Sequence, residues 1–230
     1  MRTIFSALAV FGMLQFAPTT AQADPVVVEL YTSQGCSSCP PADAMLHDLA
    51  KRDDVLALAL HVDYWDYIGW TDIFGRPENT ARQHAYARAA RATTVYTPQM
   101  IIGGVDHVIG SRPMQVMDLI QAHSRQEYPV SVSITRNGDT VQISASSTEM
   151  NNYVVELVRY TPAATVNIRR GENAGRELVY TNIVSSLEAV AEWDGAGTLK
   201  ITAPAPGSDP VAVLVQKAGH GPIVGAAQLR

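Results

Sequence analysis

The sequence has few cysteines, few charges and no long apolar run. Two cysteines in 230 residues exclude a disulfide-dense scaffold and a metal site made of cysteine alone. No apolar run reaches the roughly 18 residues that a membrane-spanning helix needs. Lys and Arg number 17 against 22 Asp and Glu, so no basic excess points to nucleic acid or an anionic membrane surface as partner. With 47% apolar and 17% charged residues, we expect a folded chain of one or two domains.

The first 23 residues have the pattern of a secretory signal peptide. Arg2 gives a positive start, residues 4–16 are apolar but too few to span a bilayer, and Ala21-Gln22-Ala23 offers small residues for cleavage. The alternative interpretation is a buried N-terminal helix. We expect cleavage after Ala23 and a mature chain, starting at Asp24, that is periplasmic or secreted. Such a compartment is oxidising and permits disulfides.

The remaining chain divides into two parts with different periodicity. Residues 24–128 alternate between strand-like and helix-like patterns, which predicts an α/β domain with a mixed central sheet flanked by helices. Its expected elements are strands 26–32, 55–62, 99–102 and 107–109, and helices 42–50, 78–91 and 114–123. Residues 129–230 alternate with period two between Gly and Pro turns, which predicts an all-β, sandwich-like domain. Its expected strands are 130–135, 141–145, 153–160, 165–169, 177–183, 187–193, 198–202 and 211–216.

The two cysteines occupy the most informative place in the chain. Cys36-Ser37-Ser38-Cys39 follows the first expected strand and opens the first expected helix, and C-x-x-C at this point of an α/β pattern is typical of a thioredoxin-like redox site. Backbone N–H groups at a helix start stabilise a thiolate. Helical spacing puts Cys39 on the apolar face and Cys36 at the exposed end. We therefore expect Cys36 to attack a substrate sulfur and Cys39 to resolve the mixed disulfide, with no organic cofactor.

Other functions fit the same residues. Cys36, Cys39 and a distal His61 could handle a metal such as copper, although two thiolates need further ligands. The β-rich part could instead be the working surface of a non-catalytic binding module. A purely structural disulfide is a further alternative, which we disfavour because closing so short a loop constrains the unfolded chain little.

The surroundings of the cysteines resemble a known family. Residues 28–43, which contain CSSCPPAD, are similar to the signature of secreted bacterial thioredoxin-like proteins that are catalogued as a domain of unknown function. The segments HVDYWD at 61–66, YTPQM at 96–100 and GENAGR at 171–176 match the same family. The resemblance covers nearly the whole mature chain. It implies a thioredoxin-like fold and no known substrate.

The resemblance also implies roles for single residues. Thioredoxin-like proteins have a cis proline that faces the cysteine pair, which corresponds here to Pro98, and the preceding Thr97 would shape redox behaviour. They often keep a buried acid in the first strand, one residue closer to the cysteines than Glu29 is here. Asp43 on the first helix is a rival for that role. If burial raises its pKa, either carboxyl could pass a proton to Cys39, or it could serve only in structural hydrogen bonds.

The end of the second expected strand is rich in polar and aromatic residues: His61, Asp63, Tyr64, Trp65 and Asp66, with Tyr67 and Trp70 close behind. Because strand carboxyl ends face the ligand crevice of an open α/β sheet, we expect these residues near the cysteines, either as a substrate-binding rim or as a packed loop. The arginines of the second helix are interpreted as a solvated face: Arg82, Arg88 and Arg91. The sequence thus predicts an exported thiol–disulfide oxidoreductase that acts on thiol- or disulfide-bearing proteins or small molecules.

Overall fold

The structure, a computed structural model, describes residues 24–230, so the expected signal peptide and its cleavage site lie outside the described residues. Within 24–230, no helix is long and apolar enough to cross a membrane. The first elements are β1 (Val26–Thr32), α1 (Pro40–Leu49), β2 (Val55–His61), the 3-10 turn η1 (Asp66–Ile68), α2 (Pro77–Ala89), β3 (Gln99–Ile102), β4 (Asp106–Ile109) and α3 (Pro113–Ser124). Strands β5 (Val130–Asn137), β6 (Thr140–Ser147), β7 (Tyr153–Asn167), β8 (Glu177–Trp193), β9 (Thr198–Pro204), β10 (Val211–Lys217) and β11 (Ile223–Leu229) follow. Strands and helices up to α3 come in the expected order.

The strands β1 and β2 form the centre of the first part. They pair in parallel, with Thr32 opposite His61, while β3 runs antiparallel to β1 and β4 antiparallel to β3. Both central strands are buried along their whole length because each face is covered. Val28 and Leu30 of β1 pack with α1 and α3, whereas Tyr31 faces the other side, with Tyr86 of α2 and strands of the second part. The carboxyl ends of β1 and β2 therefore lie side by side below the start of α1.

The main sheet continues past the expected boundary at residue 128. Residues 24–230 form one eight-stranded sheet, in the order β11-β10-β7-β8-β2-β1-β3-β4, and one three-stranded sheet, in the order β5-β6-β9. The two parts join where β8 pairs in parallel with β2, at Ile183 and Ala59. The small sheet packs on β7, β10 and β11 around a separate apolar core that includes Ile143, Tyr153 and Val213. The change in periodicity near residue 128 marks the point where helices end and only strands follow. Strands from before and after this point nevertheless belong to one sheet.

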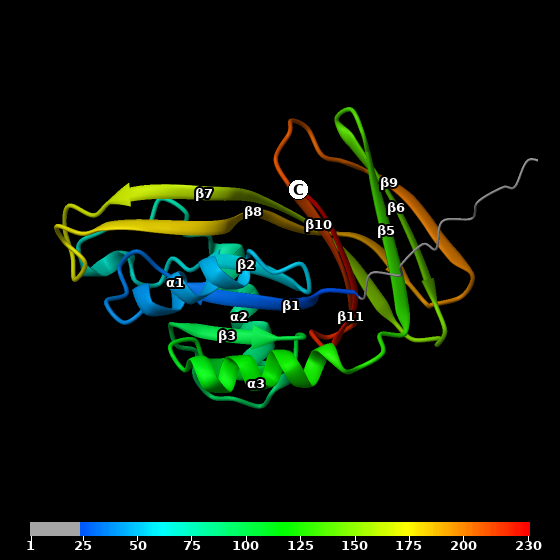
Figure 1. The fold of residues 1–230 in the computed structure, drawn as a ribbon, viewed down its shortest axis with the longest axis horizontal. Helices are drawn as coiled ribbons and strands as arrows, with labels where there is room; N and C mark the ends of the chain where they lie inside the picture. The colour runs from blue at the N-terminus through cyan, green and yellow to red at the C-terminus, as the bar shows by residue number, and fades with distance from the viewer. Residues whose placement is uncertain (1–23) are drawn as a thin grey trace, which may run out of the picture.

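Strands β7 and β8 are each one long strand where the sequence predicts two. Pro162 lies between the two strands expected within β7, and proline cannot donate to a strand ladder. The neighbouring strand β10, however, pairs with β7 only over residues 153–159, so Pro162 lies in an edge segment, where proline is tolerated. The two strands run together beyond the sheet and over α1 (Figure 1). Their connecting loop, residues 168–176, thereby reaches the segment that follows β1.

Candidate functional site

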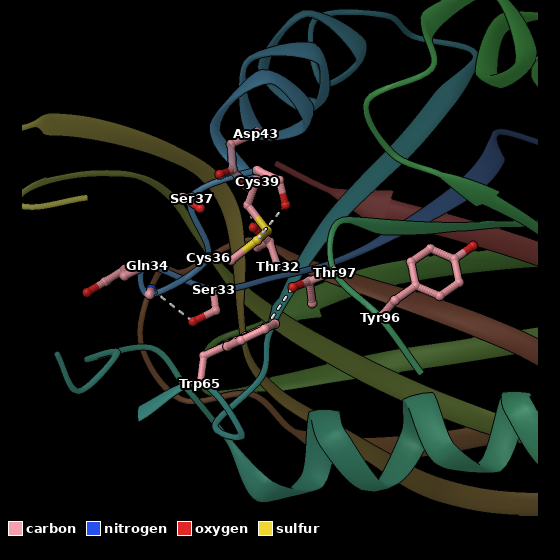
Figure 2. The surroundings of a disulfide bond; sticks show 12 residues. Thr32, Ser33, Gln34, Cys36, Ser37, Cys39, Asp43, Trp65, Tyr96 and Thr97 are labelled. Carbon is pink, nitrogen blue, oxygen red and sulfur yellow. Dashed lines mark hydrogen bonds between the residues drawn. A yellow bond between two sulfur atoms is a disulfide. The ribbon is translucent and has the colours of Figure 1, made fainter. Parts of the chain in front are cut away.

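Cys36 and Cys39 lie in the turn between β1 and α1 and form a disulfide, with their Cα atoms 5.4 Å apart. Cys39 is the N-cap residue of α1, and its carbonyl accepts hydrogen bonds from the N–H groups of Ala42 and Asp43. Pro40 and Pro41 fit the first turn because N–H groups there have no partner within the helix. The disulfide thus stands at the N-terminal end of α1 (Figure 2).

The prediction that Cys36 is exposed is wrong. Cys36 is 3% exposed and Cys39 is 0% exposed. Both cysteines precede the helix, so helical spacing does not separate them. The N–H of Cys39 donates to the carbonyl of Cys36 at 3.2 Å, and this turn directs both sulfurs inward while Ser37 and Ser38 face solvent. The Ser38 hydroxyl oxygen lies 3.4 Å from Sγ of Cys36.

The loop between β7 and β8 holds the cysteine turn in place. Asn173 is buried, and its side-chain amide donates to the carbonyls of Gln34 and Cys36, each at 2.9 Å. The hydroxyl of Ser37 donates to the carboxylate of Glu172 at 2.6 Å. Arg176 fixes Asn173 by donating to its side-chain oxygen at 3.0 Å. The segment 171–176 of the β-rich part is therefore one wall of the site, a role that the sequence did not indicate.

The segment before β3 forms a second wall. The Thr97–Pro98 peptide bond is cis, as the resemblance implied. Pro98 and Ala42 of α1 both lie against Gly110, which places the proline at the start of α1. Oγ1 of Thr97 accepts a hydrogen bond from Nε1 of Trp65 at 2.7 Å. Figure 2 shows Thr97 and Trp65 beside the disulfide.

The aromatic residues after β2 separate into two groups. Trp65 packs on Gly35 and stacks on Tyr67, which is 80% exposed, with ring centroids 6.3 Å apart. Tyr64 instead turns toward α2, where its hydroxyl donates to Gln83 and burial raises its pKa to about 12. Trp70 is tied to Gln34 through its indole N–H at 2.8 Å. Of these aromatic residues, Trp65 and the exposed Tyr67 stack on each other beside the cysteine turn.

The two aspartates of the same segment hold the loop together. Asp63 accepts a hydrogen bond of 2.6 Å from the hydroxyl of Thr80 in α2. Asp66 accepts one of 3.0 Å from the N–H of Asp72, and burial raises its pKa. Both carboxylates therefore have hydrogen-bond partners within the protein, and neither needs a substrate to supply one.

Glu29 lies on the opposite face of β1 from α1. It is fully buried, and its carboxylate accepts hydrogen bonds from Arg82 at 2.7 Å and from the hydroxyl of Tyr86 at 2.5 Å. Arg82 also donates to Glu156 of β7 at 2.8 Å, so this arginine, expected on a solvated face, is buried in an ion network. The network occupies both oxygens of Glu29 on the side of α2, which leaves Asp43 as the carboxyl on the cysteine side.

Asp43 is buried directly behind Cys39. One of its oxygens accepts a hydrogen bond from the hydroxyl of Thr32 at 2.8 Å, and its N–H bonds to the carbonyl of Cys39. Figure 2 shows Asp43 and Thr32 close to the disulfide. Burial raises the pKa of Asp43 to about 7, against the lowering effects of positive charge on His61 and of the Thr32 hydrogen bond. A carboxyl that changes protonation near neutral pH therefore stands beside Cys39.

His61 is paired with a residue that sequence reasoning missed. Its Nδ1 lies 2.7 Å from a carboxylate oxygen of Asp72, and neither side chain has any exposed surface. Asp72 also accepts hydrogen bonds of 2.8 Å from the N–H groups of Gln34 and Phe74. An aspartate shortly before Gly75 signals only a turn in the sequence. Among residues 24–230, no group of three or more His, Cys, Asp and Glu side chains is arranged to hold a metal.

Comparison with known proteins gives a family for this chain. The model of the family described as "Protein of unknown function (DUF1223)" matches residues 27–216. A protein from Agrobacterium tumefaciens with a known crystal structure has 38% sequence identity to this chain. The match covers 90% of this chain and 95% of that chain, with a TM-score of 0.79. A hypothetical protein from Pyrococcus horikoshii is 13% identical over 46% of this chain and 90% of that chain, with a TM-score of 0.25. No curated protein matches. The chain therefore belongs to the DUF1223 family of proteins of unknown function.

Proposed function

We propose that the protein is an exported thiol–disulfide oxidoreductase with a thioredoxin-like first part and with Cys36 and Cys39 as its redox pair. The observation that carries the proposal is the disulfide at the junction of β1 and α1, beside Pro98 and the buried carboxyl of Asp43. The strand order β2-β1-β3-β4, with helices on both faces, supports it. A loop this short contributes little to stability when it is closed, so a structural role accounts poorly for the bond. Export rests on the pattern of residues 1–23.

The proposed reaction exchanges one disulfide for another. In the reduced protein, the Cys36 thiolate attacks one sulfur of a substrate disulfide, which forms a Cys36–substrate bond and releases the other substrate sulfur as a thiolate that takes up a proton. The Cys39 thiolate then attacks Sγ of Cys36 and releases the first substrate sulfur. Two electrons pass from the protein to the substrate. The reverse sequence oxidises a substrate dithiol.

Asp43 is the proposed proton acceptor for Cys39. Cys39 must lose its proton before it attacks Cys36, and its complete burial disfavours the thiolate. With a pKa of about 7, Asp43 is about half carboxylate at neutral pH, which suits a general base at that pH. Thr32, which donates to Asp43, stabilises the carboxylate form. The proton therefore moves from Cys39 to Asp43 as Cys39 attacks.

The substrate surface is proposed at Trp65 and Tyr67, next to Thr97 and the exposed Ser37. The stacked rings leave Tyr67 mostly in solvent, where an apolar side chain of a polypeptide can pack on it. A thiol- or disulfide-bearing polypeptide is therefore the favoured substrate class.

Single cysteine variants test the assignment of the two sulfurs. Reduced Cys39→Ser, treated with glutathione disulfide, is expected to accumulate a stable glutathione adduct on Cys36, because no second thiol resolves it. Reduced Cys36→Ser is expected to form its adduct more slowly, since Cys39 has no exposed surface, whereas Cys36 is 3% exposed and its Sγ lies 3.4 Å from the Ser38 hydroxyl. Mass spectrometry after an acid quench measures both rates. A faster adduct on Cys39 would reverse the assignment, and no adduct on either variant would reject the function.

A further inference from the structure

We propose that Asn173, in the loop between β7 and β8, sets the reduction potential of the Cys36–Cys39 pair by holding the cysteine turn in its closed arrangement. This is a positioning role, and it rests on the proposed function. It deepens that function because it gives the β-rich part of the chain a task in the redox reaction.

The contacts of Asn173 converge on the cysteine turn. Asn173 is 1% exposed, and its side-chain NH₂ group donates to the carbonyl oxygens of Gln34 and Cys36, each at 2.9 Å. The carbonyl of Cys36 also accepts the N–H of Cys39 at 3.2 Å, the bond that closes the turn. A buried polar group that loses its partner costs free energy. One side chain of the β-rich part therefore stabilises the backbone arrangement in which the two cysteines meet.

The loop fixes the orientation of this amide. Arg176 donates to the side-chain oxygen of Asn173 at 3.0 Å, so the NH₂ group faces the two carbonyls. The loop is also closed by its own backbone. The N–H of Ile168 donates to the carbonyl of Arg176 at 2.9 Å, and the N–H of Gly175 donates to the carbonyl of Ile168 at 2.8 Å. Figure 1 shows the connected ends of β7 and β8 next to the start of α1. The amide thus reaches the turn from a closed loop and with one orientation.

The contacts are made to the oxidised turn, which gives the direction of the effect. Reduction by glutathione breaks the bond between Cys36 and Cys39. Two glutathione molecules supply two electrons and become glutathione disulfide, and their two protons pass to the cysteines. The two sulfurs then move apart, whereas Asn173 holds the backbone in the closed arrangement. A held turn keeps each sulfur in position to react with the other, which favours closing the bond. Loss of the amide should therefore make the disulfide easier to reduce.

Equilibration of the folded protein with glutathione measures this effect. In Asn173→Ala, the equilibrium constant for closing the disulfide is expected to fall about tenfold, which makes the reduction potential about 30 mV less negative. Arg176→Ala should lower the constant by a smaller factor, because the amide can then turn away from the carbonyls. The double variant should match Asn173→Ala, since both changes act through the same amide. Alkylation of free thiols and mass spectrometry give the reduced fraction, and circular dichroism confirms that each variant is folded.

Arg170→Ala is the matched control, because Arg170 is an exposed arginine of the same loop. It repeats the loss of positive charge, which by itself acts in the opposite direction, since a less stable thiolate makes a disulfide harder to reduce. Its constant should equal or exceed that of the wild type.

The outcomes separate this inference from the proposed function. An unchanged or higher constant in Asn173→Ala would overturn the inference, even if the variant is less stable to heat, because the amide would then have a structural role alone. If Asn173→Ala does not fold, Arg176→Ala decides, and a constant no lower than that of Arg170→Ala overturns the inference. A folded wild type whose disulfide does not exchange with glutathione rejects the proposed function itself, and the inference with it.

Discussion

Replacing Arg82 by alanine is expected to lower the free energy of unfolding by about 3–5 kcal/mol, the range for removing one partner of a buried ion pair. Arg82 is 7% exposed and donates to two carboxylates, Glu29 of β1 at 2.7 Å and Glu156 of β7 at 2.8 Å. It also donates to Gln216 of β10. The substitution would leave two buried carboxyls without a counter-charge, at the point where α2 joins strands from both parts of the chain.

The matched control for this variant is Arg88→Ala on the same helix. Arg88 is exposed, and substitutions at such positions usually change stability by no more than about 0.5 kcal/mol. Urea denaturation of both variants at neutral pH, followed by circular dichroism, gives the comparison. A loss below about 1 kcal/mol for Arg82→Ala, or one equal to that of Arg88→Ala, would show that the network does not hold the two parts together.

Replacing Asp43 by asparagine is expected to stabilise the oxidised protein above pH 7 by about 4 kcal/mol. The pKa of Asp43 rises from an ordinary value of 3.8 to about 7 in the folded protein, and each unit is worth about 1.4 kcal/mol. Between these two values the folded state holds a proton that the unfolded state has lost. Stability therefore falls as the pH rises through this window, and the loss is complete above pH 7. Asparagine is neutral and keeps an oxygen that can accept from Thr32, so it avoids this loss.

Urea denaturation of the oxidised wild type and of Asp43→Asn tests this expectation. The difference in unfolding free energy between them should be small near pH 4 and should grow steadily to its full value by pH 8. The two proteins share all their other ionisable groups, so the contributions of those groups cancel in the difference between the two unfolding free energies. A difference that does not change between pH 5 and pH 8 would show that Asp43 is not a buried acid with a raised pKa.

The elements around the disulfide were predictable because their signals are local. Strands β1 and β2 are apolar runs, Gly103-Gly104 marks the turn between β3 and β4, and prolines open α1, α2 and α3. The C-x-x-C spacing and its place after a strand likewise need only a few neighbouring residues.

The rest of the site depends on contacts between distant residues. The burial of Cys36 follows from its own turn and from Asn173, which is 137 positions away in sequence. Arg82 belongs to a helix whose charged residues suggest a solvated face, and its partner Glu156 is 74 positions away. The pairing of β8 with β2 rests on one residue pair, which no periodicity reveals. Local patterns predict elements, whereas the partners of a buried polar group follow from the assembled fold.

The proposed redox role of Cys36 and Cys39 is tested most directly by equilibrating the folded wild-type protein with glutathione buffers of increasing reduced fraction. Alkylation of free thiols and mass spectrometry then count the reduced cysteines, while circular dichroism confirms that the fold persists. We expect both thiols to appear together, as one reversible two-electron couple in the folded protein. A disulfide that stays closed until the protein unfolds would contradict the redox assignment.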